Sequence, residues 1–356
     1  MSTAKYLPSQ LSMRARVTLS ALAGAGLAAF GLSILGGASL AVRTQAPTDS
    51  VRQSATAPDS ILWLAMRNVN LHIDDEHVMQ VRDLRGQVTA VRAGTIPFLD
   101  DPVSFRIRVT SGTVDLTGPD LAALLNEYVF AYKGSPLRNI RGRVEGSTVV
   151  LSGIMHKGVD LPFEMTSELS LEPDGRIRSH PQKMKMLGID GTALLHALGM
   201  RLDRVLDVSG SRGATVSGDD LLLDPIKIIP PPAIEGRLAS IRVDGDRITQ
   251  TFVRTPDDTV FSKHAAMTDT SARHYLYFRG GQLRFGKLTM DDTDLLIHDA
   301  DEADPLDLYF ADYNRQLVAG HTSNLANYGL RTWMVDYAKL PAAPKEKIVA
   351  TRQSAR

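Results

Sequence analysis

Residues 117–133 read TGPDLAALLNEYVFAYK, and they belong to the stretch from Thr113 to Asp207 around which the rest of the chain is organised. Apolar residues recur in this segment at the i, i+3, i+4, i+7 spacing of one helix face. Thr117 and Asp120 form a weak capping box at its start, and Gly134 ends the pattern. The spacing predicts an amphipathic helix whose apolar face carries Leu121, Leu124, Leu125, Tyr128, Val129 and Tyr132.

A second segment, residues 192–206, reads TALLHALGMRLDRVL and has the same period. Asp190 is a good N-cap for it. Gly199 costs a helix about 1 kcal/mol relative to alanine, so packing has to supply the remaining stability. The predicted apolar side of this helix carries Leu194, Leu198, Leu202, Val205 and Leu206.

Between the two helices, residues 137–186 alternate apolar and polar side chains, with turn signals at Glu145-Gly146, Lys157-Gly158 and Pro173-Asp174-Gly175. Alternation with period two predicts strands that bury one face. Four antiparallel strands follow from this pattern, and both helices are expected to pack on their apolar face. We therefore predict an α+β fold in which a long, curved antiparallel sheet wraps around two amphipathic helices.

The flanking segments extend the sheet. Residues 61–74 read ILWLAMRNVNLHID, and their alternation breaks once near Arg67, which predicts a strand with a bulge. The run Pro230-Pro231-Pro232 stops regular structure, since proline lacks an N–H group. Residues 254–274 are polar and are expected to form a loop. The predicted divisions are an α+β domain at 61–253, a β-rich extension at 254–340 and a disordered tail at 341–356.

An uncharged run at residues 17–42 follows the basic residues of segment 1–16. Its length is sufficient to cross the roughly 30 Å hydrocarbon core of a bilayer, so we expect a transmembrane helix. The small residues Ala38-Ser39-Leu40-Ala41 leave open a cleaved signal peptide. Residues 1–16 are then cytoplasmic, residues 43–60 form a flexible linker, and the main domain lies outside the cytoplasm.

Composition excludes several classes of function. The 356 residues contain 40 Lys and Arg against 40 Asp and Glu, so no overall field attracts nucleic acid. The absence of Cys removes disulfides, thiol catalysis and Cys-based zinc sites together. The nine histidines are dispersed, and the sequence contains no nucleophile elbow, P-loop or dinucleotide fingerprint. We therefore expect no catalytic residues, no cofactor and no resident metal.

One acidic cluster leaves an alternative open. Eight carboxylates close together offer the oxygen ligands that Ca²⁺ prefers, although the EF-hand pattern is absent, and a metal-dependent hydrolase is a weak third hypothesis. A solvated acidic loop is the favoured reading, because charge runs are usually solvated. The eight are Asp291, Asp292, Asp294, Asp299, Asp301, Glu302, Asp304 and Asp307.

Four stretches carry a family resemblance: SGTVDLTGPDLAALLNEYVF at 111–130, SGIMHKGVDLPFEM at 152–165, EPDG at 172–175 and GDDLLLDPIKIIPPPAIEGRLASIRVDGDRI at 218–248. In this order they resemble the bacterial phospholipid-binding proteins of the LmeA type, which look like relatives of the tubular lipid-binding (TULIP) superfamily. The resemblance covers roughly residues 61–253. It implies an apolar groove for acyl chains and an envelope location, and it carries no catalytic residues to transfer.

The leading hypothesis is a non-enzymatic, membrane-anchored protein that binds or transfers phospholipid or another lipophilic ligand. It would reside in the inner membrane with its main domain on the periplasmic side. The alternative is a structural or assembly module that binds an envelope protein partner through residues 254–340. In the leading hypothesis the lipid groove is lined by Leu121, Leu124, Leu125, Tyr128, Val129, Leu194, Leu198 and Leu202.

Overall fold

The computed structural model describes residues 61–72, 78–156, 158–186, 189–190, 201–264, 267, 271–309, 312–324 and 329–340. All of them belong to one compact unit, Thr56–Arg356. The predicted transmembrane segment 17–42, the linker 43–60 and the tail 341–356 lie outside the described residues. Among the helices that are described, none combines the length and the apolar character needed to cross a membrane.

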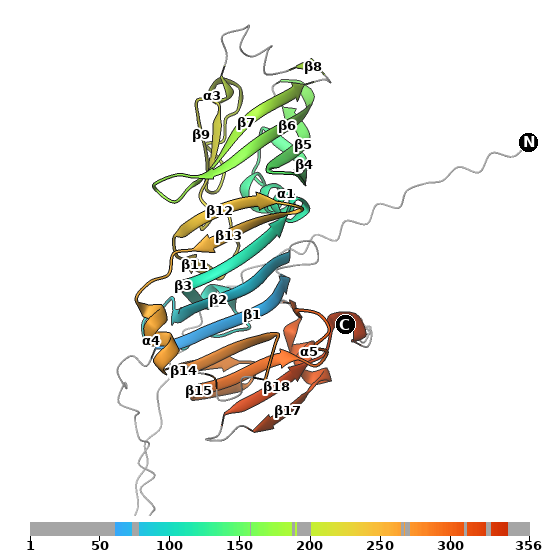
Figure 1. Cartoon of the computed structure of the whole chain (residues 1–356). Helices are drawn as coiled ribbons and strands as arrows, with labels where there is room; N and C mark the ends of the chain where they lie inside the picture. The colour runs from blue at the N-terminus through green and yellow to red at the C-terminus, as the bar shows by residue number, and fades with distance from the viewer. Residues whose placement is uncertain are drawn as a thin grey trace, which may run out of the picture. The chain divides into compact units, whose positions relative to one another are not determined.

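The larger sheet has eleven strands (Figure 1). β11 (Ala233–Glu235) runs parallel to β3 (Phe105–Thr117), and β16 (Leu306–Tyr309) runs parallel to β1 (Leu62–His72). β15 (Leu288–Asp299) and β18 (Leu330–Met334) are also parallel, and the other neighbours are antiparallel. The main path is β12 (Leu238–Asp244), β13 (Arg247–Phe252), β3 (Phe105–Thr117), β2 (Val78–Ala90), β1 (Leu62–His72), β14 (Tyr275–Phe285), β15 (Leu288–Asp299), β18 (Leu330–Met334) and β17 (His321–Asn324).

The smaller sheet has seven antiparallel strands. The four strands predicted between the helices are confirmed in it, and the predicted turns contain Gly146, Gly158 and Gly175 with positive φ. The path is β4 (Leu137–Glu145), β5 (Thr148–His156), β6 (Asp160–Leu171), β7 (Ile177–Met186), β10 (Asp220–Leu223) and β9 (Ala214–Ser217), with β8 (Ile189–Asp190) beside β7.

The predicted fold class was wrong, because the described chain is mostly β and the two long amphipathic helices are not seen. In place of the first, a seven-residue helix α1 (Gly118–Leu124) leads into a five-residue π-helix η2 (Leu125–Val129). In the second region, the described helix is α3 (Leu202–Val205), four residues long, and residues 191–200 lie outside the described part. The predicted transmembrane helix is likewise not among the helices shown.

The first helical segment is held against β4. Its capping box is confirmed, with the Asp120 amide donating to Thr117 Oγ1 at 3.3 Å. A side chain at Gly142 of β4 would overlap the Gly118 carbonyl oxygen, so helix and strand meet backbone to backbone. About two turns after Gly118, the Asn126 side chain donates to the Ile140 carbonyl at 2.8 Å and accepts from the Ile140 amide at 2.9 Å. These contacts fix the helical segment to one strand over a short length.

The predicted break in β1 lies at Asn68, whose φ is 48°. Before it, Leu62, Leu64 and Met66 face the main core, and after it Val69 and Leu71 do so. The interruption therefore shifts the alternation by one residue and keeps apolar side chains on the same face. At the same point the outer neighbour of β1 changes from antiparallel β14 to parallel β16.

The opposite face of β1 has a small core of its own, covered by α4 (Asp257–His264). Trp63 meets Phe261 of α4 edge to face, with 5.7 Å between ring centroids. The Ser111 hydroxyl donates to the buried Asp258 carboxylate at 2.7 Å, which anchors the same helix. The prediction of a loop over residues 254–274 was wrong at α4. A largely polar helix needs few apolar residues to cover one strand, so its polar sequence was interpreted as a loop.

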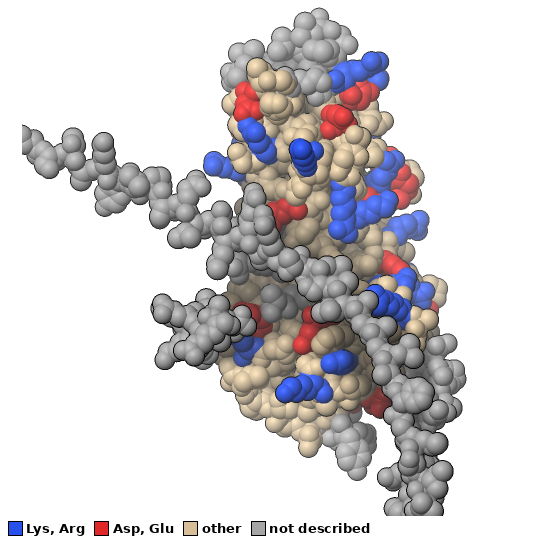
Figure 2. Space-filling model, turned by 180° about the vertical axis from the view of Figure 1, so that it is seen from behind, with Lys and Arg blue, Asp and Glu red and all other residues tan. Residues whose placement is uncertain are grey.

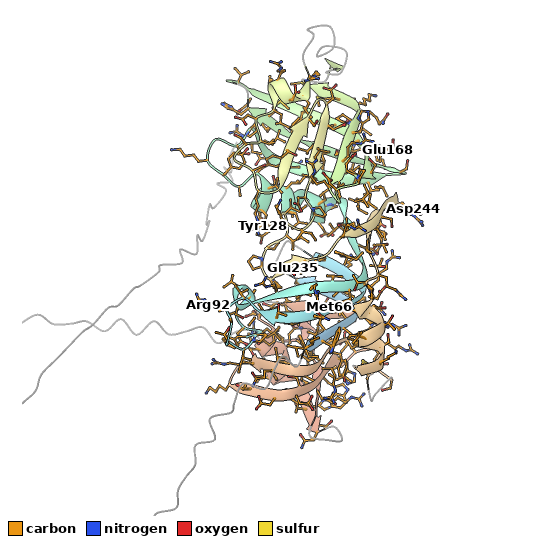
Figure 3. All side chains as sticks on the ribbon, turned by 90° about the vertical axis from the view of Figure 1, so that its left-hand side faces the viewer. Met66, Arg92, Tyr128, Glu168, Glu235 and Asp244 are labelled. Atoms are coloured by element: carbon orange, nitrogen blue, oxygen red, sulfur yellow. The ribbon has the colours of Figure 1, made fainter. Side chains whose placement is uncertain are left out.

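The two sheets share one continuous apolar core, which contains buried residues from both. α1 lies next to β3 and β4, and β12 packs along β6. Figure 3 labels one residue of each of these two strands, Glu168 of β6 and Asp244 of β12. Further short helices are η1 (Pro102–Ser104), α5 (Tyr313–Ala319) and η4 (Tyr337–Lys339).

Candidate ligand-binding site

Six of the eight predicted lipid-contacting residues lie in the described part of the chain, and they belong to the core or pack against it. Leu121, Leu124, Leu125, Val129 and Leu202 are buried, and Tyr128 is half-buried against the core. Leu194 and Leu198 lie outside the described residues.

Two of these residues, Leu125 and Leu202, line the same apolar space inside the smaller sheet, which we call the helix cavity. Its volume is only about 20 Å³. That is the room of about one water molecule. In the described residues, side chains therefore fill this space. The remaining walls are Phe130, Leu137, Ile140, Leu151, Met155, Phe163, Met165, Met184, Leu206 and Leu221.

A much larger apolar space, the proline-capped cavity, lies on the core face of β1, β2 and β3. Its volume is about 260 Å³. Small-molecule sites typically range from about 300 to 1,000 Å³, so this cavity is slightly smaller than that range. It is lined by Met66, Leu71, Met79, Val81, Leu84, Asp100, Pro102, Ile107, Ile229, Pro230, Pro231, Pro232, Ile234, Tyr313 and Asn314. In Figure 3, Met66 of this cavity lies well apart from Tyr128 on η2.

The local sequence explains this apolar wall. The register shift at Asn68 turns both Met66 and Leu71 to the core face of β1. Opposite the strands, three successive prolines contribute no N–H donors, so this side of the cavity has fewer polar groups than an ordinary loop. Ile234 follows in β11, which is held by its parallel pairing with β3. The predicted proline stop is thus also a wall of the site.

One end of the cavity is polar and is built around Asp100. Its carboxylate accepts hydrogen bonds from the Tyr313 hydroxyl, from the Gly286 amide at 2.9 Å and from Asn314 Nδ2 at 3.2 Å. Partial burial by itself raises the pKa of Asp100, but these hydrogen bonds outweigh it and hold the pKa below its ordinary value. Burial and the adjacent carboxylate raise the pKa of the Tyr313 hydroxyl. A neutral tyrosine thus donates to an ionised aspartate.

Two other depressions differ in character. A wider one of about 630 Å³, between α3 and β9, has a mixed lining that includes Arg176, Asp203 and Lys227. A third, of about 30 Å³, lies where the two sheets meet and is nearly all apolar. Figure 2 shows basic and acidic side chains interspersed over the rear face, in keeping with the equal numbers of Lys plus Arg and Asp plus Glu.

The predicted acidic cluster is divided in the folded chain. Asp291 accepts from Gln282 Nε2 at 2.5 Å, and Asp294 accepts from the Tyr277 hydroxyl at 3.2 Å. Asp307 accepts from Asn70 and pairs with His72, both at 3.0 Å. Asp299 and Asp304 instead come together with Asp336, which lies outside the sequence cluster.

The proline-capped cavity was missed as a site by sequence reasoning. Its walls come from segments near residues 66, 100, 107, 230 and 313, and no local pattern shows that these meet. The one available signal was the proline run beside an alternating apolar strand. Comparison of the chain with protein-family models, with curated proteins and with solved structures gave no match. The resemblance to LmeA-type proteins therefore stays a prediction.

Proposed function

We propose that this protein is a lipid-binding protein that holds an apolar chain in the proline-capped cavity. The observation that carries the proposal is the contrast in volume, about 260 Å³ there against about 20 Å³ in the helix cavity. Each methylene buried from water contributes about 0.8 kcal/mol, so a chain seated against these walls is bound favourably. The envelope location, as a prediction from residues 17–42, is consistent with this role.

The polar end defines which part of the ligand enters. Asp100 is ionised, and Tyr313 and Asn314 already use its oxygens. A phosphate or carboxylate placed beside it would meet a like charge. We therefore propose that the cavity takes the alkyl or acyl chain and that an anionic headgroup stays outside.

The test is native mass spectrometry of the full chain, followed by titration with a fluorescent monoacylglycerol analogue. We expect co-purifying lipid and saturable uptake. The informative variant is Met79→Trp, which fills the cavity from a half-buried position on β2. Displacing about two methylenes at 0.8 kcal/mol each weakens binding about tenfold.

The matched control is Leu161→Trp, a half-buried apolar position on β6 in the other sheet. It should bind the probe like the original chain. Equal binding by Met79→Trp and Leu161→Trp would place the ligand elsewhere. A protein that purifies without lipid and takes up no probe would refute the proposal.

A second candidate function, partner binding through the C-terminal strands, has one observation in its favour. All four residues of the edge strand β17 are exposed. An exposed edge offers unpaired backbone groups to a strand from another chain. A Ser323→Pro variant, which removes a backbone donor, should lose such a partner in a pull-down while retaining the lipid probe.

A further inference from the structure

Three aspartates from three segments of the chain meet at one end of the larger sheet. Asp299 ends β15, Asp304 lies in the turn before β16, and Asp336 follows β18. One carboxylate oxygen from each lies within 4.8 Å of those from the other two. Asp299 is buried, Asp336 is half-buried and Asp304 is exposed. The group is therefore closed to solvent at Asp299 and open to solvent at Asp304.

The side chain of Asp299 gives a second, independent indication of a ligand. The residue is 3% exposed. Its Oδ1 accepts from the Asp301 amide at 3.0 Å, whereas its Oδ2 is buried with no hydrogen-bond partner among the described residues. A buried carboxylate oxygen without a partner carries a substantial desolvation cost.

The nearby cation, Lys339, does not form a hydrogen bond with Asp299 Oδ2. Lys339 Nζ lies 2.8 Å from Asp301 Oδ2 and 2.6 Å from Asp336 Oδ2. One lysine thus pairs with two carboxylates at the rim. Asp299 Oδ2 and Asp304 remain without that contact. The local charge is therefore still strongly negative at the base of the group.

We propose that Asp299, Asp304 and Asp336 bind a calcium ion. Calcium takes six to eight oxygen ligands at about 2.3–2.6 Å. Two oxygens on opposite sides of such an ion are up to about 5 Å apart, which accommodates the observed spacing. The three ligands contain no nitrogen or sulfur, which argues against zinc. The exposed side at Asp304 leaves room for the water ligands that complete the coordination.

The proposed ion joins segments that are separate in sequence. Asp299 ends β15 and Asp336 follows the parallel neighbour β18, and Asp304 leads into β16, which pairs with β1. Bound calcium would hold these strand ends together and remove the repulsion between their carboxylates. Binding to the folded state alone raises the melting temperature in proportion to the logarithm of the free ion concentration.

The experiment uses the full chain at pH 7.5, with CaCl₂ against EDTA and MgCl₂ as a comparison. We expect one calcium per chain by calorimetry, weaker binding of magnesium, and a melting temperature raised by about 5 °C at about a hundredfold excess of Ca²⁺ over Kd. Asp299→Asn should lose the calcium response, and it should melt at a higher temperature than the original chain in EDTA.

The control is Asp292→Asn, an exposed carboxylate of the same acidic segment whose φ of 48° asparagine also adopts. It should leave calcium binding unchanged. If Asp299→Asn fails to fold, Asp304→Asn at the exposed rim tests the same site and should weaken calcium binding. An original chain with no calcium heat and no calcium-dependent melting shift would overturn the proposal. Calcium binding that survives both Asp299→Asn and Asp304→Asn would also overturn it.

Discussion

The helix cavity and the proline-capped cavity are built from the same kinds of residue but are filled to different degrees. In the smaller sheet, Phe130, Met165 and Met184 pack around Leu125 and Leu202 and leave about 20 Å³. In the larger sheet, three prolines face β1 to β3 and leave about 260 Å³. Methionines line both cavities, so the difference lies in the rigid proline segment, which does not collapse onto its neighbours. The comparison teaches that apolar content alone does not distinguish a core from a site.

The largest expected effect tests whether the helix cavity is a packed core. Leu125 is 1% exposed, so Leu125→Ala should lower the free energy of unfolding by about 2–5 kcal/mol. Met79→Ala, at the half-buried wall of the proline-capped cavity, should cost less than about 1 kcal/mol. Urea denaturation of both variants measures the difference. Equal losses would break the distinction between the two cavities.

A second variant tests how the short helix is held beside the helix cavity. Asn126→Ala removes both hydrogen bonds to Ile140 and leaves a backbone donor and acceptor of β4 unpaired. We expect a loss of about 1–3 kcal/mol in unfolding free energy. Hydrogen exchange at the Ile140 amide should increase in the same variant. An unchanged amide would show that β4 keeps this region closed without the helix.

The proline-capped cavity should respond to ligand where the helix cavity does not. A saturating monoacylglycerol analogue should raise the melting temperature of the original chain and of Leu125→Val, but not that of Met79→Trp. The expected rise is a few degrees, corresponding to about 1–2 kcal/mol of linked stabilisation. Differential scanning fluorimetry is the measurement. A ligand response that is lost in Leu125→Val instead would reverse the assignment of the two cavities.

The smallest effect concerns the polar end of the proline-capped cavity. The folded-state pKa of Asp100 is lowered, so its ionised form contributes stability that is present above pH 4. That contribution is lost as the pH falls through the lowered pKa. The original chain should therefore lose more stability between pH 5 and pH 3 than Asp100→Asn does. Melting curves at both pH values decide this, and parallel losses would contradict it.

Local patterns predicted local structure well. The turns at Gly146, Gly158 and Gly175, the capping box at Thr117 and the break near Arg67 depend on neighbours in sequence, and they appear in the structure. The prediction of two long helices was wrong because apolar periodicity in the sequence does not include tertiary contacts. The close approach of Gly118 to Gly142, and the bonds of Asn126 to β4, join residues whose meeting no helical pattern specifies.

Both candidate sites depend on contacts between distant segments. The proline-capped cavity joins Met66 to Asp100, Ile234 and Tyr313, and the proposed calcium site adds Asp336 to Asp299. Apolar periodicity identifies which face of a strand is buried, but it does not identify the neighbouring strand. For the same reason the partners of β1 were not predicted. β14 pairs with β1 across the boundary drawn at residue 253, so segments 61–253 and 254–340 share one sheet.

The change of neighbours at Asn68 also bears on the order in which the chain folds. One edge of β1 pairs with the nearby strand β2, but its other edge waits for Tyr275–Arg279 and then for Leu306–Tyr309. On a growing chain, an apolar central strand therefore keeps one edge open until most of the protein has been synthesised. Long-range pairing of this kind slows folding and exposes strand edges to aggregation. We therefore expect efficient production of this protein to depend on protecting β1 until β14 and β16 have been synthesised.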